Sequence, residues 1–249
     1  MKKIQTVMFA VSTTIMLGQI NHLHAEEQVL STLGCMLTPS EEVEVSSPVT
    51  GILDKVSVSR GTKVKKGQRL FQLKAGVERE GVQLATVKAG FAKRKVSRNK
   101  ELFDENIITP HERDEMETEL LIAQSELRLR QQELALRTVY SPINGVVVNR
   151  NNSKGEYVSI DPILSLATLD PLHVDLLLPS NYFGQIALKD KLLIKPASDI
   201  IESRLAEVIT VDPLIDPASG TFRVQLIMSN PKNKIPAGLR CSAQVSNES

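Results

Sequence analysis

Apolar residues follow different spacings along this chain, and each spacing predicts a different kind of element. Residues 47–73 and 139–168 contain short β-rich runs between prolines and glycines, as strands joined by tight turns do. Residues 74–138 hold few prolines and repeat apolar positions with a heptad spacing, which predicts helices. From residue 169 onward, alternating runs return between turn-forming residues, and such a series of short strands predicts a small β-barrel. The barrel strands are expected at 172–178, 191–194, 205–211 and 222–228.

The two β-rich runs are copies of one another. The segment that begins at Ser47 aligns without a gap with the segment that begins at Ser141. Matched pairs are Ser47 with Ser141, Pro48 with Pro142, Gly51 with Gly145, Gly61 with Gly155, Val64 with Val158 and Leu70 with Leu164. Neither copy alone can bury an apolar face, because one or two isolated hairpins are marginal in water. An ordinary β-repeat is the alternative, but the helical interruption favours one domain built from two half-units.

Glycines mark the turns within the half-units. Gly61 and Gly67 flank Val64 in the pattern Gly-x-x-Val-x-x-Gly, which suits a tight turn with positive φ or a close approach of two backbones. The structural turn glycines predicted from the repeat are Gly51, Gly61, Gly67, Gly145 and Gly155.

The segment between the half-units predicts an antiparallel helical hairpin, with helices over 77–105 and 110–137. Leucines recur with a heptad spacing in the second helix, as in a packing seam: Leu120, Leu127 and Leu134. The first helix is expected to meet this seam through Val77, Leu84 and Phe91. A further stripe of Ile122, Leu129 and Leu136 lies on another face and predicts a second partner, such as a neighbouring protomer.

Charges and a cap support the hairpin. Basic residues gather between 93 and 100, and acidic residues between 112 and 119, so an antiparallel turn brings opposite charges together. Each exposed pair contributes only about 0.2–1 kcal/mol. Thr109, Pro110 and Glu112 form a capping-box pattern at the start of the second helix. At about 1.5 Å per residue, the arm is on the order of 40 Å long.

Composition and missing motifs narrow the classes of function. The formal net charge of +1 argues against nucleic acid, which requires a concentrated basic field. Beyond residue 25 the histidines are His111 and His173, without ligand-spaced partners, so no metal site is expected. No phosphate loop, dinucleotide fingerprint or nucleophile elbow is present. We therefore expect a non-enzymatic protein without a cofactor.

The first 25 residues predict export. A basic start at Lys2 and Lys3 is followed by a mostly apolar run and a small residue, Ala25, before Glu26, as in a cleaved signal peptide. An uncleaved anchor is the alternative, but the run carries polar residues and is shorter than the roughly 20 that a span needs. A lipid anchor on Cys35 is disfavoured, because a polar stretch separates that cysteine from the apolar run.

The halves split by a helical hairpin resemble a biotinyl/lipoyl-type domain as found in the periplasmic adaptor (membrane fusion) proteins of tripartite efflux pumps. The C-terminal run from Val211 to Leu239 is similar to the barrel domain of those adaptors, although Ala237 interrupts the family's Pro-Gly. The resemblance implies an elongated, modular α+β fold with a split lipoyl-like sandwich, a hairpin and a small barrel. The expected division is a signal peptide (1–25), a segment leading from the barrel (26–46), the two sandwich halves (47–73 and 139–168), the hairpin (74–138) and the barrel (169–249).

The hairpin tip resembles the family's docking motif. Arg98, Leu102 and Thr109 follow the spacing of an Arg/Leu/Ser pattern by which such adaptors dock on an outer-membrane channel, with Thr in place of Ser. The alternatives are a helix cap for Thr109, a solvated charge for Arg98 and a core contact for Leu102.

The resemblance also implies partners and location. An inner-membrane efflux transporter of the resistance-nodulation-division type, an outer-membrane channel and further copies in a homo-oligomeric ring are the expected partners in the periplasm. An ABC-type or type I secretion exporter is the alternative transporter. A carrier domain is the alternative from another class, but helices replace the turn on which its cofactor-bearing lysine would lie.

Cys35 and Cys241 are the two cysteines of the chain. In the related adaptors an N-terminal strand returns to the barrel, and export makes a disulfide between these cysteines plausible. Two buried free thiols, which behave as small apolar side chains, are the alternative.

Overall fold

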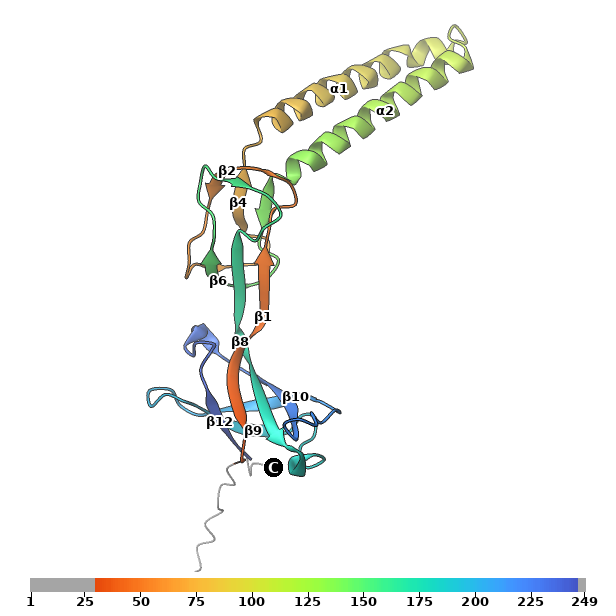
Figure 1. The fold of residues 1–249 in the computed structure, drawn as a ribbon. Coiled ribbons are helices and arrows are strands. Elements are labelled where there is room, and N and C mark those ends of the chain that lie inside the picture. Colours follow the sequence, from red (N-terminus) through yellow and green to blue (C-terminus); the bar gives the residue numbers. More distant parts are fainter. Residues whose placement is uncertain (1–29, 246–249) are drawn as a thin grey trace, which may run out of the picture.

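The computed structural model describes residues 30–245, and over this range the molecule is elongated (Figure 1). A rolled sheet carries both ends of the described chain, a small sandwich lies in the middle, and a helical hairpin forms the other end. This arrangement confirms the predicted α+β class. The predicted signal peptide lies outside the described residues. None of the helices between residues 30 and 245 is long and apolar enough to cross a membrane.

The sandwich is built from short strands of both half-units. Its first half contributes β2 (Gly51–Val56), β3 (Lys63–Val64) and β4 (Arg69–Leu73). Its second half contributes β5 (Thr138–Tyr140), β6 (Gly145–Arg150), β7 (Tyr157–Val158) and the start of β8 (Leu164–Pro179). The start of β8 also pairs with β1 (Gly34–Val45).

The half-units exchange strand pairings reciprocally. Strand β2 pairs with β7, where Gly51 lies opposite Val158, and β3 pairs with β6, where Val64 lies opposite Gly145. Because Gly51 matches Gly145 and Val64 matches Val158 in the sequence repeat, these pairings are equivalent. They enclose a core that includes Phe71, and such a side chain contributes roughly 1.5–3 kcal/mol when buried. The prediction that the two copies face each other is therefore confirmed.

The turn glycines divide into two groups. Gly61, Gly67 and Gly155 have φ values of 83°, 82° and 94°, where a side chain is strained. Gly51 and Gly145 instead lie in strands, where the absence of a side chain leaves room for neighbouring atoms. The repeated glycines thus serve turn geometry at some positions and close approach at others.

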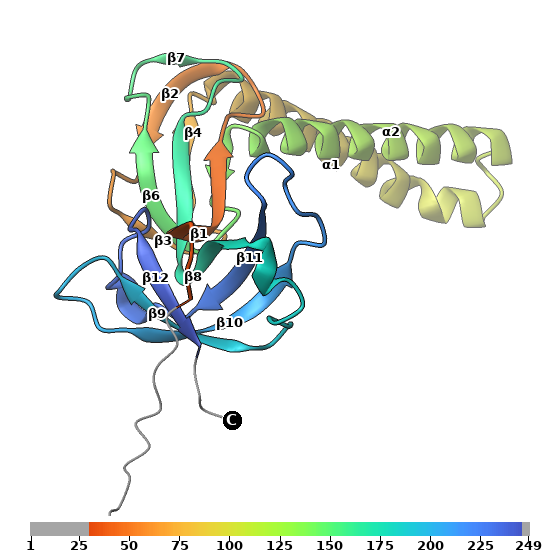
Figure 2. The same ribbon diagram turned by 60° about the horizontal axis from the view of Figure 1, so that its bottom comes forward.

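The C-terminal strands roll around a second core (Figure 2). They are β9 (Lys191–Pro196), β10 (Arg204–Val211), β11 (Thr221–Met228) and β12 (Cys241–Val245), with short 3-10 helices at Ser180–Tyr182 and Pro231–Asn233. The sheet order is β12-β9-β10-β11-β8, and β8 then pairs with β1. Where β1 passes the start of β12, the described chain has one isolated bridge, from Met36 to Arg240 just before β12, so the predicted barrel lacks a continuous closing ladder.

Two long strands connect the rolled sheet to the sandwich. Strands β1 and β8 run side by side through both units, and Figure 1 shows them as the axis of the molecule. The predicted strand at 172–178 is therefore the second half of a longer one. The N-terminal segment, predicted only to lead from the barrel, contains the whole of β1.

The predicted hairpin consists of α1 (Gly76–Asp104) and α2 (Pro110–Ala135). Leu120 and Leu127 pack at the helix interface, as predicted. The predicted face of α1 is wrong, because the buried residues there are Ala85, Ala89 and Ala92. Small alanines let the helices approach closely, whereas the larger residues of the predicted stripe remain exposed by 83%, 59% and 51%: Val77, Leu84 and Phe91.

Ion pairs confirm the antiparallel alignment of the helices. Lys95 Nζ lies 2.7 Å from Glu119 Oε2, and Lys88 Nζ lies 3.2 Å from Glu126 Oε1. All four side chains are at least one-third exposed, so each pair adds little stability. Together they favour this alignment of α1 against α2 over shifted alignments.

Candidate partner-binding site at the hairpin tip

A complete capping box forms the start of α2 at the hairpin tip. The Thr109 hydroxyl accepts a hydrogen bond from the backbone N–H of Glu112 at 3.2 Å, and Pro110 occupies the first turn. The Glu112 carboxylate accepts from the backbone N–H of Thr109 at 2.9 Å and from its hydroxyl at 2.8 Å. These two donors, the backbone group first, hold the pKa of Glu112 below its usual value.

This geometry limits what Thr109 offers to a partner. The Thr109 hydroxyl already donates its proton to the Glu112 carboxylate, and one lone pair of its oxygen accepts from the backbone N–H of Glu112. A hydroxyl has one donor and two acceptor positions, so only an acceptor position remains without breaking the cap. Thr109 is therefore suited to receive a hydrogen bond from a partner.

Leu102 and Arg98 lie on the last two turns of α1, both exposed to solvent. The Leu102 carbonyl accepts from the backbone N–H groups of Ile107 at 2.8 Å and Ile108 at 3.2 Å, which folds the loop over the helix end. The side chains of Leu102 and Ile107 remain 38% and 64% exposed. The structure thus places an apolar pair at the extreme tip, of which the sequence analysis identified only Leu102.

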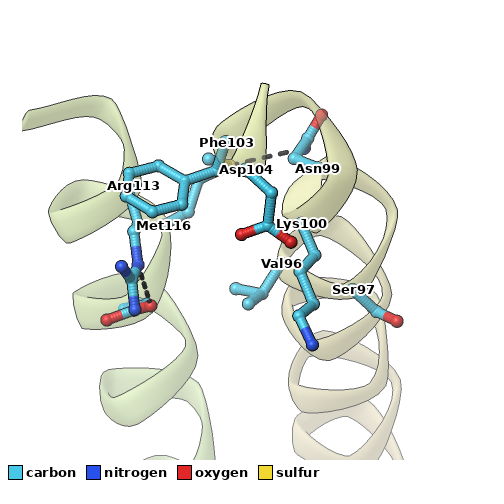
Figure 3. A pocket seen from close by; sticks show the side chains of 9 residues that line it. Val96, Ser97, Asn99, Lys100, Phe103, Asp104, Arg113 and Met116 are labelled. Carbon is cyan, nitrogen blue, oxygen red and sulfur yellow. Dashed lines mark hydrogen bonds and ion pairs between the residues drawn. The ribbon is translucent and has the colours of Figure 1, made fainter. Parts of the chain in front are cut away.

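A hollow of about 210 Å³ opens between the helices just below the tip (Figure 3). The guanidinium carbon of Arg113 lies 4.3 Å from the centre of the Phe103 ring, a cation–π distance, and its Nε donates to Glu117 at 2.6 Å. Between the same two helices, the Asn99 amide of α1 donates to the Met116 sulfur of α2 at 3.4 Å. The interface between the helices thus contains a polar asparagine and a flexible methionine near the tip. Nearer the base of the hairpin it consists of alanines and leucines.

Sequence reasoning missed this hollow. Phe103 and Arg113 stand on different helices, and nothing in their spacing shows that the two side chains meet. The available signal was the change from alanine to larger or polar residues along the α1 seam after Ala92.

The two cysteines meet where the rolled sheet returns on itself. Cys35 of β1 and Cys241 at the start of β12 are joined by a disulfide, with their Cα atoms 4.9 Å apart. The bond lies one residue from the isolated bridge between Met36 and Arg240. It therefore ties the two strands at the position where their backbone pairing is sparse.

No group of three or more His, Cys, Asp or Glu side chains within residues 30–245 is arranged to hold a metal ion. His111 is exposed beside Glu115, with its Nε2 3.5 Å from the carboxylate, and His173 lies on β8.

Comparison with known proteins places this architecture. Residues 41–167 match the family described as the CzcB-like, barrel-sandwich hybrid domain. The toluene efflux pump periplasmic linker protein TtgA of Pseudomonas putida is 33% identical over 137 residues, which cover 53% of this chain and 35% of that relative. The multidrug resistance protein MexA of Pseudomonas aeruginosa is 26% identical over 223 residues, covering 81% of this chain and 57% of MexA. The match therefore spans about a third of the length of TtgA and little more than half of the length of MexA.

Solved structures share the fold. A MacA–MexA chimeric protein that contains the Pseudomonas aeruginosa MexA α-hairpin domain superposes with a TM-score of 0.77 at 18% identity, covering 88% of this chain and 79% of the chimera. The membrane fusion protein Spr0693 of Streptococcus pneumoniae superposes with a TM-score of 0.69 at 16% identity, covering 87% of this chain and 99% of that protein. At these identities the likeness concerns the fold alone.

Proposed function

The chain belongs to the CzcB-like barrel-sandwich hybrid family, and from that premise we propose that it is a non-enzymatic periplasmic adaptor linking an inner-membrane efflux transporter to an outer-membrane channel. The observation that carries the proposal is the split sandwich, which projects a hairpin away from the rolled sheet (Figure 1). Relatives that match this chain are named periplasmic linkers of efflux pumps, which supports the same role.

The tip is the surface proposed to meet the channel. Leu102 at the end of α1 and Ile107 in the following loop present an apolar pair to solvent. Arg98 adds a positive charge one turn before Leu102 on α1. Exposed apolar residues grouped at the end of an arm are typical of a contact surface, because they gain free energy when a partner covers them. The capping box keeps the loop shape that presents them.

The outward faces of the hairpin are proposed to meet further copies of the chain. Ile122 and Leu129 on α2 and Leu136 at its C-cap repeat with a heptad spacing and are 64%, 56% and 43% exposed. A heptad stripe of this kind is typical of helix packing. Sedimentation analysis of a Leu129→Glu variant tests this part, with Leu121→Glu as the control, since Leu121 is equally exposed but lies outside the stripe. Self-association that survives Leu129→Glu would contradict it.

Two alternatives remain distinct from the main proposal. A carrier domain needs a lysine on the turn between its half-units, whereas α1 and α2 occupy that position here. An ABC-type or type I secretion exporter would use the same architecture with another transporter. A resistance-nodulation-division transporter is our proposal for the inner-membrane partner.

A Leu102→Asp variant tests the adaptor role. In cells that depend on this chain for export, the new charge should raise sensitivity to exported toxicants, because it places a carboxylate in the proposed apolar contact. Leu121→Asp, a change at an exposed position on the same hairpin, is the matched control. Unchanged sensitivity at normal periplasmic levels of the Leu102→Asp protein would rule out docking through this tip.

A further inference from the structure

The hairpin meets the sandwich through a joint with little packing of its own. Two chain crossings connect them, one between Leu73 and Gly76 and the other between Ala135 and Thr138. Over the described residues, neither helix packs extensively against a strand. Other contacts must therefore set the direction in which the hairpin points.

Arg137 supplies such contacts at the second crossing. Its Nη1 donates to the Thr50 carbonyl at 2.8 Å, and its Nη2 lies 2.6 Å from Glu78 Oε1 in the first turn of α1. Its own carbonyl accepts from the backbone N–H of Leu73 at 2.8 Å. One residue thus ties the end of α2 to the start of α1, to the approach of β2 and to the end of β4.

This ion pair is better shielded than the other salt bridges of the described chain. The Arg137 and Glu78 side chains are 22% and 19% exposed, whereas at least one partner of every other pair is 45% exposed or more. Partial burial reduces screening by water and salt, so the pair holds its geometry more firmly than a surface pair does. A guanidinium also donates in two directions from one rigid plane, which a lysine ammonium does not do.

Gly51 leaves the space that the guanidinium occupies. A Cβ at position 51 would lie 2.9 Å from Arg137 Nη1, closer than side chains normally approach. The neighbouring residue Thr50 is the acceptor of the same guanidinium. The repeat glycine in the first half-unit therefore serves the joint with the hairpin.

We propose that Arg137 is a positioning residue that fixes the direction of the hairpin relative to the sandwich. Loss of its contacts frees the hairpin to pivot about the two crossings while both units stay folded. This effect on direction follows from the joint alone. Its consequence, a tip that misses its partner, rests on the proposed adaptor function.

Distance measurement between spin labels tests the proposal in the full chain. Labels introduced as unnatural amino acids at Ser153 in the sandwich and Thr118 on α2, both exposed, leave the two cysteines untouched. Double electron–electron resonance should give a narrow distance distribution for the unsubstituted protein. Arg137→Ala should broaden and shift it, and Arg137→Lys should restore only part of the narrow distribution.

Milder variants and matched controls separate positioning from stability. Glu78→Gln keeps the Thr50 contact and should give an intermediate width. Gly51→Ala should displace the guanidinium and reproduce the Arg137→Ala distribution. Arg130→Ala removes the exposed Arg130–Glu133 pair, and Gly81→Ala adds a Cβ at an ordinary 3.7 Å from Arg130, so both should leave the distribution unchanged.

Circular dichroism provides the independent check that helices and strands remain in each variant. An Arg137→Ala or Glu78→Gln distribution equal to that of the Arg130→Ala control would overturn the proposal, whatever the effect on melting temperature. Broadening without any loss of export would retain Arg137 as the positioning residue and would argue against the docking role of the tip.

Discussion

Gly51 and Gly145 occupy equivalent positions in the two half-units, but a methyl group on each would meet a different kind of neighbour. At Gly145 the added Cβ would lie 2.5 Å from the carbonyl oxygen of Ala167, which belongs to the backbone of β8. At Gly51 it would lie 2.9 Å from Arg137 Nη1, the far end of a long side chain. The same residue type is therefore required for different reasons in the two copies.

We predict that Gly145→Ala destabilises the protein more than Gly51→Ala does. Backbone in a paired strand has little freedom to move, and overpacking of this kind typically costs about 1–3 kcal/mol. Displacement of the Arg137 guanidinium should cost less in the free energy of unfolding. Urea denaturation of both variants measures the difference. Equal losses would show that the Arg137 side chain is as rigid as the β8 backbone.

The capping box makes the stability of the hairpin tip depend on pH. Glu112 has a lowered pKa in the folded protein, so its ionised form stabilises the cap above the pKa of an unfolded glutamate. This contribution is lost as the pH falls through the lowered, folded-state pKa. We predict that Glu112→Gln removes this acid-dependent part, as measured by hydrogen exchange of the first turn of α2 against pH.

Glu101→Gln, at an exposed position of α1, is the control for the change of charge. Thr109→Ala should weaken the same turn at all pH values, because loss of a cap typically costs about 0.5–2 kcal/mol. A Glu112→Gln protein with the same pH profile as the unsubstituted protein would contradict a role for the carboxylate in the cap.

Local patterns predicted the repeat, the capping box and the turns at Gly61, Gly67 and Gly155, because each depends on residues close in sequence or on an exact repeat. The same patterns placed Gly51 and Gly145 in turns, whereas both lie in strands and make room for atoms of residues distant in sequence. The packing face of α1 was missed because heptad counting selects large residues, whereas Ala89 and Ala92 form the close contact. The ties made by Arg137 could not be predicted either, since Thr50 and Glu78 reach it only after the half-units have paired.

The sandwich should fold without the hairpin. Gln72 lies opposite Thr138 in the β4–β5 pair, so the two ends of the inserted segment are already neighbours. We predict that replacement of residues 74–136 by a two-residue Asn-Gly turn between Leu73 and Arg137 leaves a β-protein with a cooperative thermal melt, because such a turn suits two adjacent antiparallel strands. Circular dichroism should show the loss of helix with retention of strand. A product without a cooperative transition would mean that the half-units need the hairpin to pair.

The disulfide between Cys35 and Cys241 should contribute substantially to the stability of the rolled sheet. It joins β1 to β12 where, among the described residues, the pairing is limited to one isolated bridge and a few backbone hydrogen bonds, and it closes a loop with a sequence separation of 206. Closure of a long loop restricts the unfolded chain, and native disulfides typically contribute about 2–4 kcal/mol. We predict that the exported protein, denatured without reductant, shows no free thiols, and that reduction lowers its free energy of unfolding in urea. A Cys35→Ala/Cys241→Ala variant should have the lower stability from the start and no response to reductant. Two free thiols per chain in the exported protein would show that the cysteines remain reduced, and the seam between β1 and β12 would then depend on packing and on a few backbone hydrogen bonds.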